Sequence, residues 1–179
     1  MKLFAPIIAL ALVPTVAGAQ RAIPSTPSLG MAEGRCRPGE SGPSFLINVT
    51  GLKDRRGEIK VELYPANDDD FLGDDNKLVA AGKVFRRTIT HLPASGPVTV
   101  CIRAPSAGTW ALSLLHNRDG ARQFSVSTDG VGFPGNPSSL GPRKPRLAYG
   151  RATVGNGPTR ITVRMLYRRG LFSFGPINS

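Results

Sequence analysis

The stretch "GEIKVELY" (residues 57–64) repeats with a period of two. Ile59, Val61 and Leu63 are apolar, and charged residues stand between them. Successive side chains of a β-strand point to opposite faces of a sheet, so this alternation predicts a half-buried strand. The stretch "TRITVRMLYRR" (159–169) repeats the pattern over a greater length, and apolar residues occupy every second position from Ile161. These two stretches decide the fold class.

Weaker strand patterns surround them, separated by Gly, Pro and Asn-Gly turn signals. A helix is expected nowhere, apart from one turn at most within residues 74–82. We therefore expect an all-β fold, a seven- to eight-stranded antiparallel sandwich of immunoglobulin-like or transthyretin-like type over residues 44–169. The other expected strands are residues 45–51, 83–90, 97–103, 109–116, 123–127 and 147–154.

The chain begins "MKLFAPIIALALVPTVAGAQ", a basic residue followed by a short apolar run and small residues. This pattern predicts a signal peptide over residues 1–19, cleaved after Ala19, and a buried N-terminal helix is the alternative. We expect residues 20–43, rich in Pro, Ser and Gly, to form a flexible arm, and residues 170–179 to form a C-terminal tail. No later stretch is long and apolar enough for a transmembrane segment. The expected location is the periplasm or the medium.

Two cysteines remain after the signal peptide, Cys36 and Cys101. An isolated pair in an oxidising compartment predicts one disulfide, which would join the arm to a core strand. Two buried free thiols are the alternative. A metal site made of cysteine alone would lack ligands.

The charge is strongly positive. Of 23 Lys and Arg residues only Lys2 lies in the signal peptide, which leaves 22 basic against 12 acidic residues and a formal charge of +10. Such a charge favours an anionic envelope polymer or lipid as partner. Another envelope protein is a further candidate, and export argues against nucleic acid. A generally basic surface without a specific partner is the alternative.

Four motifs carry a family resemblance: "INVTGLKDRRGEIKVELYPANDDDFL", "GTWALSLLHN", "GVGFPGNPSSLGPRKPRL" and "ITVRMLY". In this order, over roughly residues 45–167, they resemble the secreted bacterial domain of unknown function 2141 family. The resemblance implies a β-sandwich fold and export, and it lends no activity. The centre departs from the family pattern, because Asn117 stands where Asp is usual and Arg118 follows it.

The candidate site residues follow from two loops. His116, Asn117 and Asp119 lie at a strand end, where they could bind a ligand or a metal, act in hydrolysis, or simply turn the chain. The other candidates are the basic residues of the Gly/Pro-rich loop: Arg143, Lys144 and Arg146.

No nucleophile elbow or carboxylate pair indicates an enzyme. The acidic run 67–76 starts like a calcium loop but has Leu72 and Val79 where ligands are needed. We expect no cofactor and no metal. The leading hypothesis is a non-enzymatic, exported envelope module that binds an anionic envelope component or a protein partner. The alternatives are a metal-binding or hydrolytic site at His116 and Asp119, and a scaffold that pairs through sheet edges.

Overall fold

The computed structural model describes residues 22–121 and 123–177, and the predicted signal peptide lies outside them. The described residues form an all-β fold, as the sequence predicts, with three short helices, of which one lies within residues 74–82, where a helical turn is expected. The helices are α1 (Met31–Gly34), α2 (Asp75–Ala80) and α3 (Leu147–Gly150). The strands are β1 (Ser44–Thr50), β2 (Glu58–Pro65), β3 (Arg86–His91), β4 (Val98–Arg103), β5 (Gly108–Asn117), β6 (Gly130–Gly132), β7 (Arg151–Val154), β8 (Pro158–Arg168) and β9 (Phe174–Gly175).

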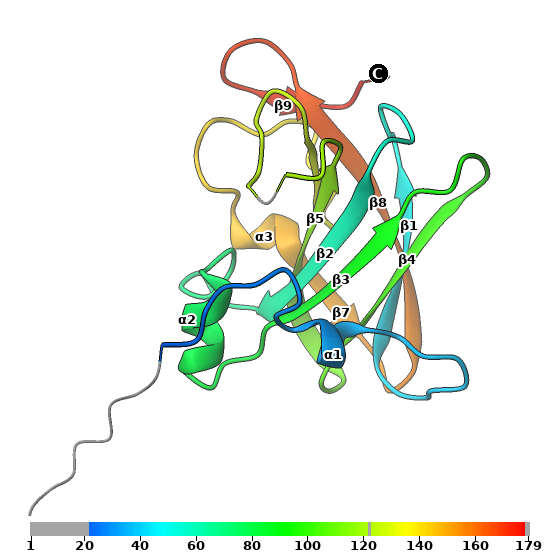
Figure 1. Cartoon of the computed structure of the whole chain (residues 1–179), viewed down its shortest axis with the longest axis vertical. Helices are drawn as coiled ribbons and strands as arrows, with labels where there is room; N and C mark the ends of the chain where they lie inside the picture. The colour runs from blue at the N-terminus through cyan, green and yellow to red at the C-terminus, as the bar shows by residue number, and fades with distance from the viewer. Residues whose placement is uncertain (1–21, 122, 178–179) are drawn as a thin grey trace, which may run out of the picture.

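The strands form one mixed sheet in the order β3-β2-β5-β6-β8-β1-β4, with β7 also paired to β5 and β9 to β8. The sheet curls until its two end strands approach each other, which gives a nearly closed barrel (Figure 1). The Arg86 guanidinium crosses the remaining gap and donates a hydrogen bond of 3.1 Å to the carbonyl of Arg103.

The expected antiparallel sandwich is therefore corrected in its finer detail. β1 pairs with β8 in parallel, with Ile47 opposite Ile161 and Val49 opposite Val163. A strand that alternates along its length fits a parallel or an antiparallel neighbour equally well, so the sequence pattern does not contain this direction. The parallel pair joins both ends of the chain into one curved sheet instead of two stacked sheets.

Two local expectations also change. Residues 123–127, expected as a strand, form a turn, and the strand at this place is the short β6. The expected strand over 147–154 begins as α3 and becomes extended only in β7.

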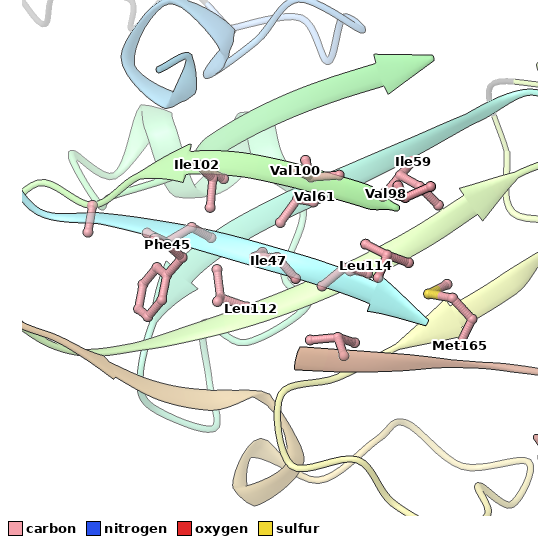
Figure 2. Packing of buried hydrophobic residues seen from close by; sticks show 14 of the residues in the cluster. Phe45, Ile47, Ile59, Val61, Val98, Val100, Ile102, Leu112, Leu114 and Met165 are labelled. Atoms are coloured by element: carbon pink, nitrogen blue, oxygen red, sulfur yellow. The ribbon is translucent and has the colours of Figure 1, made fainter. Parts of the chain in front are cut away.

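The interior of the barrel is filled by apolar side chains that alternate along the strands (Figure 2). The residues predicted to point inward do so in β2 and β8, where Val61 and Met165 are completely buried. Gly130 makes room for one of the larger rings, because a Cβ there would come within 2.4 Å of Tyr167. The sixteen buried residues of this inner core are Phe45, Ile47, Val49, Ile59, Val61, Leu63, Val98, Val100, Ile102, Ala104, Leu112, Leu114, Val154, Val163, Met165 and Tyr167.

A second apolar cluster lies on the outer face of the sheet. The helices α2 and α3 and the loop between β6 and α3 cover part of this face. Tyr64 and Phe71 meet edge to face at 5.9 Å, and Phe71 meets Phe133 at 6.2 Å. The cluster consists of Tyr64, Phe71, Leu78, Phe85, Ala111, Phe133, Leu140, Leu147 and Leu166. Both faces of the central strands are thus buried, which explains why the outer face also contains apolar residues.

Residues 22–43, for which the sequence predicts a flexible arm, lie across the gap between β3 and β4. The carbonyl of Gly30 accepts a hydrogen bond of 3.0 Å from the amide of Arg87 on β3. Gly34 packs so closely there that a Cβ would come within 2.4 Å of the Arg87 carbonyl. The predicted disulfide, Cys36–Cys101, then joins the segment to β4, with the two Cα atoms 6.0 Å apart. The segment therefore bridges both edges of the sheet.

Reduction of this disulfide is expected to lower the free energy of unfolding by up to about 4 kcal/mol, since the bond closes a loop with a sequence separation of 65. Thermal or urea unfolding with and without dithiothreitol measures the effect. The double variant Cys36→Ser/Cys101→Ser is the control and should not respond to the reductant. Equal stability of the oxidised and reduced wild type would contradict this role of the bond.

Candidate functional site

His116 lies near the C-terminal end of β5 and is completely buried. Its Nε2 is 2.8 Å from the carbonyl of Arg56, which can only accept, so Nε2 carries the proton and donates. Nδ1 must then accept, and the Tyr167 hydroxyl donates to it at 2.6 Å. The same hydroxyl accepts a hydrogen bond of 3.0 Å from the amide of Lys53. The two side chains thus fix the loop between β1 and β2 to the ends of β5 and β8.

This environment favours the neutral imidazole. Burial lowers the pKa of His116 below its ordinary value, against the smaller opposing effects of the Arg56 carbonyl and the Asp54 carboxylate. Burial also raises the pKa of Tyr167 to about 12, so the hydroxyl keeps its proton. Both ring nitrogens of His116 are engaged, so neither is placed to bind a metal ion or to act as a base on an external molecule.

The residues after His116 stabilise the loop between β5 and β6. Asp129 is buried and accepts hydrogen bonds from the backbone amides of Arg118 at 3.0 Å and Ser125 at 2.9 Å. Arg118 in turn pairs with Asp54 on the loop after β1 and donates to the carbonyl of Thr128. The Arg118 guanidinium lowers the pKa of Asp54 to about 2.

Two of the predicted site residues make contacts in this loop. The Asn117 side chain is buried and donates to Glu58 and to the Ala121 carbonyl, whereas Asp119 is exposed and accepts the amide of Ala121 at 2.9 Å. Among the described residues no group of three or more His, Cys, Asp or Glu side chains is arranged to hold a metal ion. The geometry around His116 is that of a rigid turn.

A pocket of about 500 Å³ lies instead on the outer face of the sheet, where the second cluster ends. Its base is formed by outward-facing residues of β2, β5 and β6, among them Leu115 and Val131. Its walls are three loops, residues 123–128, 141–146 and 169–173, and we call this site the groove. Its lining residues are Lys60, Glu62, Leu72, Ser113, Leu114, Leu115, Phe124, Val126, Val131, Phe133, Gly141, Pro142, Arg143, Pro145, Arg168, Leu171, Phe172, Ser173 and Phe174.

The charged part of the groove base is neutralised from within the fold. The Lys60 ammonium lies 3.3 Å from Glu62, and Arg87 contacts the same carboxylate at 2.7 Å. Arg87 also pairs with Asp75 at 2.9 Å, and Tyr64 donates to Glu62 at 2.6 Å. Burial alone raises the pKa of Glu62, but Lys60, Arg87 and the Tyr64 hydroxyl outweigh it and the pKa lies below its ordinary value. Two cations thus match two carboxylates here.

The rim of the groove, in contrast, has cations without partners. Arg143 and Arg168 line the groove and are exposed, and neither forms an ion pair within the described part of the chain. Arg168 is oriented by a hydrogen bond of 2.9 Å from its Nε to the Gly170 carbonyl. Of the other predicted basic residues, Lys144 points away to the Asp68 carbonyl at 3.3 Å, and Arg146 precedes α3 outside the lining.

Sequence reasoning found one of the groove residues, Arg143, and missed the rest. Leu171 and Phe172 fall in the expected tail, and Phe124 and Val126 fall in the expected strand 123–127. The sequence feature that could have indicated these wall residues is a run of apolar residues after Arg169, in a segment that otherwise resembles a tail.

Comparison with known proteins gives one result. A family model described as an uncharacterized protein conserved in bacteria (DUF2141) matches residues 47–162. Since this is well over half of the chain, the chain belongs to that family, as the sequence motifs indicate. No curated protein and no solved structure matches the chain. The match includes β2, β5 and Arg143 but ends before Arg168 and the loop 169–173.

His116 is expected to make the protein less stable as the pH falls from 7 to 5. The imidazole has a lower pKa when folded than its ordinary value near 6.5, so the unfolded chain binds the proton first. The stability is fully present above about pH 6.5 and is lost as the pH falls toward the folded pKa. The lowered carboxyl pKa of Asp54 lies below this window.

Urea unfolding at several pH values measures this slope. The variant His116→Gln should have a flatter slope between pH 7 and 5 and should be less stable at pH 7 by about 1–3 kcal/mol, because buried partners lose hydrogen bonds. The exposed His91 provides the control, because His91→Gln removes a histidine without breaking a buried hydrogen bond and should leave the stability at pH 7 close to that of wild type. An unchanged slope in His116→Gln would show that another group titrates.

Proposed function

We propose that the protein is an exported, non-enzymatic binding module of the bacterial cell envelope, and that its groove holds an anionic amphiphile. The ligand would be an acyl chain with an acidic head group. The acyl chain would lie on the apolar base, and the head group would be held by Arg143 and Arg168.

The observation that carries this proposal is the combination of an apolar base with unpaired arginines at one rim. Most of the lining is aliphatic or aromatic and suits an acyl chain, and a volume of about 500 Å³ falls within the usual range of ligand sites, about 300–1,000 Å³. Guanidinium groups bind carboxylates and phosphates through paired hydrogen bonds. The cations at the base, Lys60 and Arg87, are already paired with carboxylates. An anion would therefore be attracted mainly by the arginines at the rim.

Export is supported by the sequence of residues 1–19 and by the disulfide, since such bonds persist in oxidising compartments. The formal charge of +10 without the signal peptide further favours an acidic ligand over a cationic one. Binding is proposed in place of catalysis because the buried histidine has both nitrogens occupied. Among the described residues, no helix has the length and apolar character needed to cross a membrane.

Added bulk at the wall of the groove is expected to weaken binding. Gly141 lines it, and a Cβ at this position meets no atom within 4 Å, so Gly141→Leu adds an apolar side chain without a clash. Affinity for a fluorescently labelled palmitate should fall by about tenfold or more, measured by titration. Gly155→Leu is the matched control, since its Cβ also meets nothing and it lies outside the groove. Equal affinity of both variants would place the ligand elsewhere.

The affinity for the acidic head group is expected to depend on the positive charge of the arginines at the rim. Arg143→Glu and Arg168→Glu should each weaken palmitate binding by about tenfold, the loss of a charge-assisted hydrogen bond. Arg160→Glu makes the same charge change at the other end of β8 and should leave affinity within about twofold. The uncharged methyl ester of palmitate should bind all four proteins alike. A methyl ester that binds wild type as tightly as palmitate would contradict the role of the arginines.

A further inference from the structure

We propose that the protein docks on anionic phospholipid bilayers through the hairpin between β8 and β9, whose tip, Leu171 and Phe172, inserts into the interface. The tip residues also belong to one wall of the groove, but the inference does not require a ligand in the groove. It rests on the shape of the hairpin, the exposure of its tip and the charges beside it.

The hairpin is built to present its tip. The amide of Arg169 donates to the Ser173 carbonyl at 2.7 Å, and the Ser173 hydroxyl donates back to the Arg169 carbonyl. Gly170 has a φ of +79°, a conformation that suits glycine in a tight turn. β9 then pairs with β8, so both stems of the hairpin are attached to the barrel. The two residues between Gly170 and Ser173 are left at the tip.

The exposure of these residues is unusual. Leu171 is 74 % exposed and Phe172 is 73 % exposed. The next most exposed large apolar side chains in the described part of the chain are Val126 at 49 % and Phe124 at 45 %, on the loop after β5. Figure 1 shows the loops that follow β5 and β8 at the same end of the barrel, and all four side chains line the mouth of the groove. Water-exposed apolar side chains gathered at one place indicate an interaction surface.

The charges at this end identify the partner. Arg168 and Arg169 flank the tip directly, and Arg143 lies across the groove mouth. Apolar side chains at a loop tip, surrounded by arginines without carboxylate partners, match a bilayer whose surface is negative and whose interior is apolar. A second copy of this chain would bring the same arginines together, and their repulsion argues against a dimer through this face.

Docking in this orientation would also place the mouth of the groove against the lipid. Arg143 and Arg168 would then lie at the level of the phosphate groups, with the apolar base behind them. An acyl chain could pass between bilayer and groove without crossing water. Trp110 lies at the opposite end of β5, beside Pro65 and Ala152, and would stay in water-facing surroundings away from the membrane.

This position of Trp110 allows a direct test. The chain contains one Trp, so Leu171→Trp adds a single reporter at the tip. With vesicles of phosphatidylcholine and phosphatidylglycerol, the variant should show a blue-shifted emission and quenching by brominated acyl chains, whereas wild type should show neither. Pure phosphatidylcholine vesicles should give at least about fivefold weaker binding, because each arginine near an anionic surface contributes on the order of a factor of five.

Matched variants separate docking from ligand capture. Leu171→Ser/Phe172→Ser removes apolar surface that is largely exposed and that also belongs to the groove wall, and it should weaken vesicle binding by about tenfold or more with an unchanged melting temperature. Gly141→Leu, which adds bulk to the wall of the groove, should bind vesicles like wild type. Loss of vesicle binding in Gly141→Leu would mean that the groove captures a lipid and that the tip does not dock. An emission shift that grows with protein concentration without vesicles would show self-association and overturn the proposal.

Discussion

The parallel pairing of β1 with β8 is the contact on which the rest of the structure depends. It joins the first long strand of the barrel to the last, so that the strands form one nearly closed sheet with an inside and an outside. The inside is filled by residues that alternate along each strand, and strong curvature brings them together from six strands. The remaining opening lies between β3 and β4, and the N-terminal segment bridges it with backbone hydrogen bonds on one side and the disulfide on the other. Removing either bridge would leave two strand edges free to pair with other chains.

The closure of the barrel also determines how the outer face of the sheet is covered. A short β6 leaves a large part of β5 without full cover, and the second apolar cluster only partly fills this surface. The loop that contains Phe133 and Leu140 covers one end, and the groove is the part that stays open. The charges of Lys60 and Glu62 could be buried at its base because Arg87 and Asp75 complete a neutral group with short contacts. A buried charge without such partners would cost several kcal/mol. The charges of Lys60 and Glu62 at the groove base are therefore compensated within the fold, and the rest of the base is apolar.

The sequence predicts the elements of this fold better than their arrangement. Alternation in "GEIKVELY" and "TRITVRMLYRR" identified both strands and the face that each buries, since period two is a property of a single strand. It could not specify that β8 runs parallel to β1, because partner and direction depend on residues more than a hundred positions away. Cys36 and Cys101 were predicted to pair because only one pairing exists. The groove could not be predicted, because its walls come from loops that are neighbours only after closure. Leu171 and Phe172 in particular belong to a segment that would be a tail if β9 did not pair with β8.

The fold gives His116 a structural role. The sequence places it at a strand end beside an acid, which resembles a reactive site, but the fold uses it to join Tyr167 to the loop between β1 and β2. Each side chain of this pair stands one residue before the end of its strand. β5 ends at Asn117 and leads to the loop of Phe124, and β8 ends at Arg168 and leads to the hairpin of Leu171. Those walls contain exposed apolar side chains, and their positions depend on where their strands end. A neutral, completely buried His–Tyr pair fixes both strand ends at once. The role that the structure gives to this histidine is therefore a structural one, which holds the strand ends that lead to the walls of the proposed groove.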